Sequence, residues 1–202
     1  MTDPIDPCND PTPPIPCERT TGDITDNDVK CAQQEWCNGL LEISRLYWDQ
    51  PRGDFRGYAE RFINKLYDFL PEGAGRVFFR PTLAVFPNNF RTTFDGTLEY
   101  FVGDENEPDA PEGFAKANFF EANYSNRVDT EATAIQRFGN TAVAMGNVCL
   151  KEKVIIDDRE VIKDTVVDKV FVYRKDRTDN NQLKLIVHMS AKRNSAGEAA
   201  VE

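Results

Sequence analysis

Apolar side chains recur at helical spacing in the first third of the folded sequence. Thr25 is a suitable N-cap, and the stripe that follows it should end near Trp48, before Pro51. The members of the stripe are three or four residues apart: Val29, Ala32, Trp36, Leu40, Ile43 and Tyr47. This spacing predicts an amphipathic helix. Gly39 lies inside it at a cost in helix stability, which indicates close approach by another element.

A second helical pattern follows after a short connection. Asp54 can cap it, and it should run to about Phe69, before Pro71 and two glycines. Its apolar stripe is Tyr58, Phe62, Leu66 and Phe69. Because the connection is short, we expect the two helices to be neighbours in space.

From Arg76 onward the period changes to that of extended chain. Residues 80–103 read as two extended or bent segments, and residues 114–121 as a strand or an irregular edge. Further strands are predicted at 132–138, 141–151, 165–175 and 183–191, with turns at 139–140 and 176–181. Helices followed by antiparallel strands predict an α+β domain with the helices on one face of a curved sheet.

Both ends of the chain differ in composition from the middle. Residues 1–22 contain six prolines and almost no apolar side chains, so we expect a disordered tail or linker. Residues 193–202 read as a frayed tail, which leaves 23–192 as the folded domain. The sequence contains no signal or transit peptide pattern and no apolar run of about 20 residues.

Charge and the count of metal-binding side chains narrow the functional classes. The net charge is −10, from 34 acidic and 24 basic residues, which disfavours binding to nucleic acid or to an anionic membrane. His188 is the only histidine and no Cys-x-x-Cys pair is present, so a zinc site is not expected. A hard cation held by oxygen ligands stays open, although no calcium-loop motif supports it.

The five cysteines are odd in number in a chain that is not short, so a disulfide framework is not expected. Cys31 and Cys37 read as small apolar residues of the first helix. For Cys8 and Cys17, pairing and free thiols stay equally open.

The stretch 80–103 places hydroxyls, among them Thr82 and Tyr100, between large apolar groups, which is the composition of a small-molecule pocket. On the last strand, alternation puts His188 and Ser190 on one face together with Lys184 and Ile186. Val187 and Met189 then point to the other face. His188 is either a base or proton shuttle or a structural histidine, and the spacing alone favours the structural role.

Seven segments of the chain resemble the iota-class carbonic anhydrases of cyanobacteria and algae. They are WCNGLLEIS (36–44), AERFINKLY (59–67), RPTLA (80–84), FRTTFDG (90–96), EYFVG (99–103), NTAVAMGN (140–147) and LIVHMS (185–190). The resemblance covers residues 26–192. It implies a cone-shaped fold similar to nuclear transport factor 2 and to the association domain of calmodulin-dependent kinase.

The resemblance also implies an activity and a site. The family hydrates CO2 reversibly, usually as a dimer, and its cyanobacterial members work without a metal, while diatom relatives are linked to manganese. Its bicarbonate pocket uses a threonine, a tyrosine and a serine, which correspond to Thr82, Tyr100 and Ser190 here. His188 lies close by as a further candidate catalytic residue. An algal chloroplast is the compartment that the resemblance suggests.

The last strand departs from the family pattern, which typically reads His-His-Ser-Ser. Here the same place reads His188-Met189-Ser190-Ala191, so that one histidine and one serine are absent. The sequence therefore supports two hypotheses. The first is a metal-free CO2 hydratase that binds CO2 and bicarbonate. The second is a catalytically degenerate association or ligand-binding domain, as a homodimer or as one repeat of a longer protein that pairs with another repeat.

Overall fold

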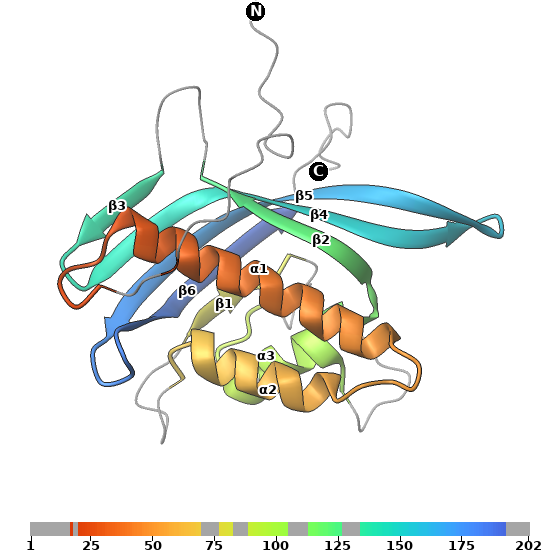
Figure 1. The fold of residues 1–202 in the computed structure, drawn as a ribbon, viewed down its shortest axis with the longest axis horizontal. Coiled ribbons are helices and arrows are strands. Elements are labelled where there is room, and N and C mark those ends of the chain that lie inside the picture. The colour runs from red at the N-terminus through yellow and green to blue at the C-terminus, as the bar shows by residue number, and fades with distance from the viewer. Residues whose placement is uncertain are drawn as a thin grey trace, which may run out of the picture.

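A computed structural model describes Cys17 and residues 20–69, 77–82, 89–104, 113–126 and 134–192. In these residues, three α-helices pack on one face of a six-stranded sheet, as Figure 1 shows. The strand order is β1-β6-β5-β4-β2, and β3 pairs with β4. The predicted α+β class with helices on one face is confirmed. Of the predicted tail at 1–22, residues 1–16, 18 and 19 lie outside the described residues, as does the predicted tail at 193–202.

The first helix is confirmed in full. α1 (Asp26–Trp48) begins with a capping box, in which the Thr25 side chain accepts from the Asp28 backbone and the Asp28 side chain accepts from the Thr25 backbone. α2 (Phe55–Leu66) is capped by Asp54 as predicted, but it ends three residues before Phe69. No helix in the described part of the chain is long and apolar enough to cross a membrane.

The close approach predicted at Gly39 is present. A Cβ atom added at this position would lie 2.2 Å from the Phe62 ring of α2. Only glycine therefore lets α1 and α2 pack at this distance, and the helix-propensity cost is offset by the contact that it permits.

The prediction of extended segments throughout 80–103 was wrong. Phe94–Val102 form a helix, α3, whose N-cap is Thr93 and which ends at Gly103 with a positive φ of 81°. The Thr93 side chain accepts from the Gly96 backbone. The capping residues Thr93 and Gly103 can be identified in the sequence, but the high content of threonine and aromatic residues favoured the prediction of a strand.

The sheet is built mainly from three long antiparallel strands. These are β4 (Thr141–Ile156), β5 (Arg159–Asp176) and β6 (Gln182–Lys192). The flanking elements are β1 (Phe78–Arg80), the 3-10 turn η3 (Phe114–Lys116), β2 (Asn118–Ser125) and β3 (Ile135–Phe138). β4 and β5 extend well beyond their predicted bounds and form a hairpin arm whose tip projects past the other strands (Figure 1).

The assignment of side chains to the two faces of β6 was partly wrong. The β5–β6 register shifts between Val172 and Tyr173, so that Val172 pairs with Val187 while Tyr173 pairs with Leu185. This bulge adds one residue to β6 and inverts the alternation. Leu183 and Leu185, not Lys184 and Ile186, are therefore buried together with His188 and Ser190.

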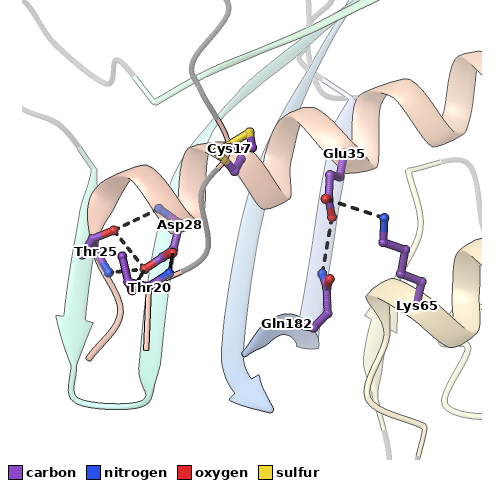
Figure 2. The surroundings of a disulfide bond; sticks show 8 residues. Cys17, Thr20, Thr25, Asp28, Glu35, Lys65 and Gln182 are labelled. Carbon is purple, nitrogen blue, oxygen red and sulfur yellow. Dashed lines mark hydrogen bonds and ion pairs between the residues drawn. A yellow bond between two sulfur atoms is a disulfide. The ribbon is translucent and has the colours of Figure 1, made fainter. Parts of the chain in front are cut away.

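The cysteine predictions also need correction. Cys17 is bonded to Cys31 on α1, and Cys149 is disulfide-bonded too, so Cys31 is not simply a small apolar helix residue. Figure 2 shows the Cys17 bridge beside the start of α1, where Thr20 and Asp28 also meet. Cys37 is free and buried, as expected. The reason for the miss is tertiary: the chain before α1 folds back along the helix.

Candidate functional site

The four predicted site residues come from three separate elements. Thr82 follows β1, Tyr100 lies on α3, and His188 and Ser190 lie on β6. β1 pairs in parallel with β6, with Phe79 opposite His188 and Arg80 opposite Met189. This pairing brings the segment that carries Thr82 alongside the segment that carries Ser190.

His188 is enclosed by aromatic rings, and its residue exposure is only 1%. Its ring stacks on Phe79 at 4.4 Å and meets the rings of Phe171 and Trp36 at their edges. Burial, together with the nearby Lys169 charge, holds the pKa of His188 well below its ordinary value. His188 is therefore neutral at physiological pH.

Both ring nitrogens of His188 have polar partners. Nδ1 lies 2.9 Å from the Tyr67 hydroxyl, which in turn accepts a hydrogen bond from Trp36 Nε1 at 3.0 Å. Nε2 lies 3.0 Å from Lys169 Nζ and 3.1 Å from Ser190 Oγ. The imidazole thus connects a buried hydroxyl on one side to an amine and a hydroxyl on the other.

Ser190 is buried and its hydroxyl lies within hydrogen-bond reach of two nitrogens. Lys169 Nζ donates to Ser190 Oγ over 2.6 Å. The Arg80 guanidinium donates to the Ser190 carbonyl oxygen, which fixes the strand at this residue. Ser190 therefore sits in a small polar group, Ser190–His188–Lys169, inside an otherwise aromatic core.

Tyr100 and Thr82 form a second polar group. Burial raises the pKa of the Tyr100 hydroxyl to about 12, although a hydrogen bond from the Thr82 backbone lowers it in part. The Tyr100 ring packs edge-on against Phe79 at 5.2 Å. Tyr100 thus stays a neutral hydrogen-bonding group next to Thr82.

Phe79 links the two polar groups, because its ring contacts both Tyr100 and His188. In the structure, Ser190 lies beside His188 and Tyr100 lies beside Thr82, and both pairs contact the same aromatic ring. The chain that continues from Thr82, residues 83–88, lies outside the described residues. The convergence of all three hydroxyls on one ligand stays a prediction.

The two departures from the family motif lie on the other side of β6. Met189 is 46% exposed and Ala191 is exposed as well, whereas His188 and Ser190 are buried. Strand alternation explains this division. The buried histidine and the buried serine are retained, and the positions that differ face outward.

The outer face of the sheet carries an open trough of about 450 Å³. Its floor is apolar and is formed by Met145, Val170 and Met189, which pair with one another across β4, β5 and β6. Arg80 and Asp168 flank it. Lys169 and Ser190 also border the trough, although both residues are buried.

Sequence reasoning missed Lys169. It lies at a core-facing position of β5, between buried Val167 and Phe171, and its own exposure is 7%. Burial lowers the pKa of its amine to about 7, despite an opposing effect of Cys37. A lysine in phase with an apolar strand face was the signal. Across the described ranges, no three His, Cys, Asp or Glu side chains form a group that could hold a metal ion.

Three comparisons place this chain among known proteins. A family model described as metal-independent carbonic anhydrase matches residues 27–192. A metal-independent carbonic anhydrase from Nostoc is 37% identical over 168 residues, which are 83% of this chain and 73% of the relative.

Two solved structures are also similar. A cyanobacterial iota-carbonic anhydrase, solved in complex with bicarbonate, superposes with a TM-score of 0.67 and 35% identity over 86% of this chain and 94% of that one. A nuclear transport factor 2-like protein from Salmonella enterica has 14% identity and a TM-score of 0.48 over 85% of this chain and 94% of that one.

Proposed function

Because this chain belongs to the metal-independent carbonic anhydrase family, we propose that it hydrates CO2 reversibly to bicarbonate without a metal cofactor. The observation that carries the proposal is the buried Ser190 hydroxyl, which lies 2.6 Å from Lys169 Nζ and 3.1 Å from His188 Nε2. A hydroxyl held by two nitrogens in an aromatic enclosure can position a water molecule or a bicarbonate oxygen.

Hydration of CO2 requires a positioned water, a group that takes its proton, and donors for the oxygens that gain charge. In this proposal, Ser190 holds the water or the bicarbonate, and Thr82 and Tyr100 donate to the oxygens of the carbon species. Tyr100 can donate at neutral pH because burial raises its pKa to about 12. His188 orients Ser190 through Nε2.

His188 and Ser190, the buried residues of β6 that match the family pattern, favour this proposal over a degenerate association domain. The missing serine of the family motif corresponds to Ala191, which is exposed, while Ser190 is 3% exposed. A change on the outer face leaves the buried hydroxyl in place. The substitutions at 189 and 191 therefore weigh little against catalysis.

The first test is CO2 hydration by the purified protein before and after exhaustive treatment with a chelator, with the metal content measured alongside. We expect the hydration rate to be the same in both samples, because the proposed chemistry uses side-chain hydroxyls and nitrogens only. A zinc-dependent carbonic anhydrase is the matched control and should lose its activity. Loss of activity on chelation, with recovery on adding manganese or zinc, would contradict the proposal.

We also propose that the outer trough is the contact between two copies of this chain. Three large apolar side chains on this face are exposed, Phe78 by 61%, Met145 by 49% and Met189 by 46%. A two-fold axis would place the same apolar surface on both sides of the contact. Arg80 and Asp168 carry opposite charges beside the trough, so that Arg80 of one copy could pair with Asp168 of the other.

Light scattering after size-exclusion chromatography tests this contact. We expect a dimer for the wild type and a monomer for Met189→Glu, because the substitution places a charge in the apolar floor. Ile162→Glu is the control, since Ile162 is 58% exposed but lies on the hairpin arm. A monomeric wild type, or a dimer that withstands Met189→Glu, would refute the contact.

A further inference from the structure

Lys169 is a buried lysine that is not among the four predicted site residues and has no proton-transfer step in the function proposed above. Its Nζ lies 2.6 Å from Ser190 Oγ, 3.0 Å from His188 Nε2 and 4.7 Å from the centre of the Trp36 ring. No carboxylate is recorded as its partner among the described residues. A lysine in such a place is either an unpaired buried cation or a neutral amine, and the hydrogen bonds around it distinguish the two.

The direction of the hydrogen bonds can be followed from Trp36. Its indole nitrogen only donates, so the Tyr67 oxygen accepts from it. The Tyr67 hydrogen is then available for His188 Nδ1 at 2.9 Å. A neutral imidazole that accepts at Nδ1 carries its hydrogen on Nε2.

The same reasoning continues to Lys169. Nε2 of His188 and Nζ of Lys169 approach to 3.0 Å, and in a hydrogen bond between them one of the two nitrogens supplies the lone pair. Nε2 is a donor by the preceding step, and an ammonium group has no lone pair. In the His188 tautomer with its hydrogen on Nε2, the amine of Lys169 is therefore neutral.

We propose that the neutral amine of Lys169 accepts, through the Ser190 hydroxyl, the proton that water loses when it adds to CO2. This inference rests on the proposed function, and it names the proton acceptor that the function requires. His188 is the positioning residue, since its Nε2–H lies within reach of both Nζ and Ser190 Oγ.

The step balances without a further reagent. The water oxygen forms a bond to the CO2 carbon, and one C=O electron pair moves onto oxygen. For the transfer, His188 Nε2–H donates to Ser190 Oγ instead of to Nζ, which frees the lone pair of Lys169 for the Ser190 hydroxyl. A water proton then passes to Ser190 Oγ as the Ser190 hydrogen passes to Lys169 Nζ. The products are bicarbonate and the Lys169 ammonium, which returns its proton to the solvent buffer before the next turnover. His188 Nε2–H can donate to Ser190 Oγ, 3.1 Å away, while Lys169 is charged.

Lys169 has a pKa near neutrality, whereas burial moves the pKa values of the neighbouring groups named next away from neutrality. Burial raises the pKa of the Cys37 thiol on α1 to about 12, and it raises the pKa of the Tyr67, Tyr124 and Tyr173 hydroxyls. The pKa of His188 is well below its ordinary value. Arg80 donates to the Ser190 carbonyl, and Asp168, the neighbour of Lys169 on β5, accepts from Asn147 over 2.6 Å.

Two opposing effects place the pKa of Lys169 at about 7. Burial disfavours the ammonium and lowers the pKa by the larger effect. The opposing effect is the interaction with Cys37, which raises the pKa. The Trp36 ring, whose centre is 4.7 Å from Nζ, also lies where it can stabilise a charged amine. A proton acceptor with a pKa near the working pH both takes up and releases its proton readily.

The test is the pH dependence of hydration and dehydration in the wild type and in Lys169→Met. In the wild type, kcat/KM for hydration should rise with pH through a midpoint near 7, because hydration needs the free amine. Dehydration of bicarbonate should fall through the same midpoint, because it needs the ammonium. Lys169→Met should lower both rates by about 10²-fold and abolish this midpoint.

Lys169→Arg separates proton transfer from simple attraction of an anion. Arginine keeps a positive charge but does not give up its proton at these pH values. We expect Lys169→Arg to be as impaired as Lys169→Met. Activity retained in Lys169→Arg, or in Lys169→Met with an unchanged pH profile, would overturn the role of Lys169 while leaving the proposed hydratase function intact.

NMR titration of the lysine side chains in the wild-type protein provides a readout that does not depend on activity or on the folding of a variant. One lysine signal should titrate near pH 7 and should be absent from Lys169→Met. A set of lysines that all hold their protons above pH 9 would overturn the proposal. An inactive wild-type protein would instead end the proposed function, and with it the step assigned to Lys169.

Discussion

Ser190→Ala is expected to lower kcat/KM for CO2 hydration by about 10²-fold or more, the usual cost of removing one hydrogen-bonding group from a transition state. The substitution removes the hydroxyl that Lys169 and His188 hold at 2.6 Å and 3.1 Å. It also leaves a buried amine without its hydroxyl partner. Stopped-flow hydration assays with a pH indicator measure the change.

The neighbouring residue offers a matched control. Ala191→Ser places a hydroxyl one position away on the same strand but on the exposed face, and we expect it to leave the rate unchanged. Thr82→Ala should reduce the rate as well, because the proposal assigns Thr82 a hydrogen bond to the carbon species. A hydration rate that withstands both Ser190→Ala and Thr82→Ala would exclude the proposed site.

Lys175→Met is expected to lower the free energy of unfolding by about 3–5 kcal/mol, the range for removing one partner of a buried ion pair. Lys175 Nζ lies 3.6 Å from Asp28 Oδ2, and the two side chains are 0% and 4% exposed. The same amine donates to the Thr20 and Gly22 carbonyl oxygens at 2.8 Å and 3.0 Å. It therefore holds the chain before α1 against the sheet.

Urea denaturation followed by tryptophan fluorescence measures this effect. Lys153→Met is the control, because Lys153 and Glu160 form an ion pair whose side chains are 42% and 57% exposed. That substitution should cost no more than about 1 kcal/mol. Equal losses in the two variants would contradict the structural role assigned to Lys175.

The pH dependence of the Lys175→Met penalty adds a second readout. Burial would raise the pKa of Asp28, but hydrogen bonds from Thr20 and Thr25 outweigh it and hold the pKa below the ordinary value of 3.8. The folded-state pKa is thus lowered, so Asp28 contributes stability above pH 3.8 that is lost as the pH falls through the folded-state pKa. We expect the difference between wild type and Lys175→Met to shrink over that acid range, where Asp28 loses its charge.

The elements with strong local signals were predictable from the sequence. α1 and α2 follow from apolar stripes and from the capping side chains of Thr25 and Asp54, which act within a few residues. Even the close helix contact at Gly39 was visible, because a glycine inside a helix needs a reason. α3 was missed because its aromatic and threonine content competes with the cap at Thr93.

The features that depend on distant strands were not predictable. A bulge between β5 and β6 decides that Leu185, and not Ile186, is buried with His188. The Cys17–Cys31 bridge requires the part of the chain before α1, which carries Cys17, to fold back onto α1. Both depend on contacts between residues whose positions local periodicity does not fix.

The α+β class could be predicted from the sequence, and so, through the matching segments, could the family and the candidate hydroxyls. The side of β6 on which those residues lie, and the position of Lys169 beside Ser190 and His188, became clear from the fold alone. The physical reason is the range of the interactions. Caps and stripes are set by neighbours along one helix, whereas the state of a buried amine is set by side chains from α1, β5 and β6 that meet only after folding.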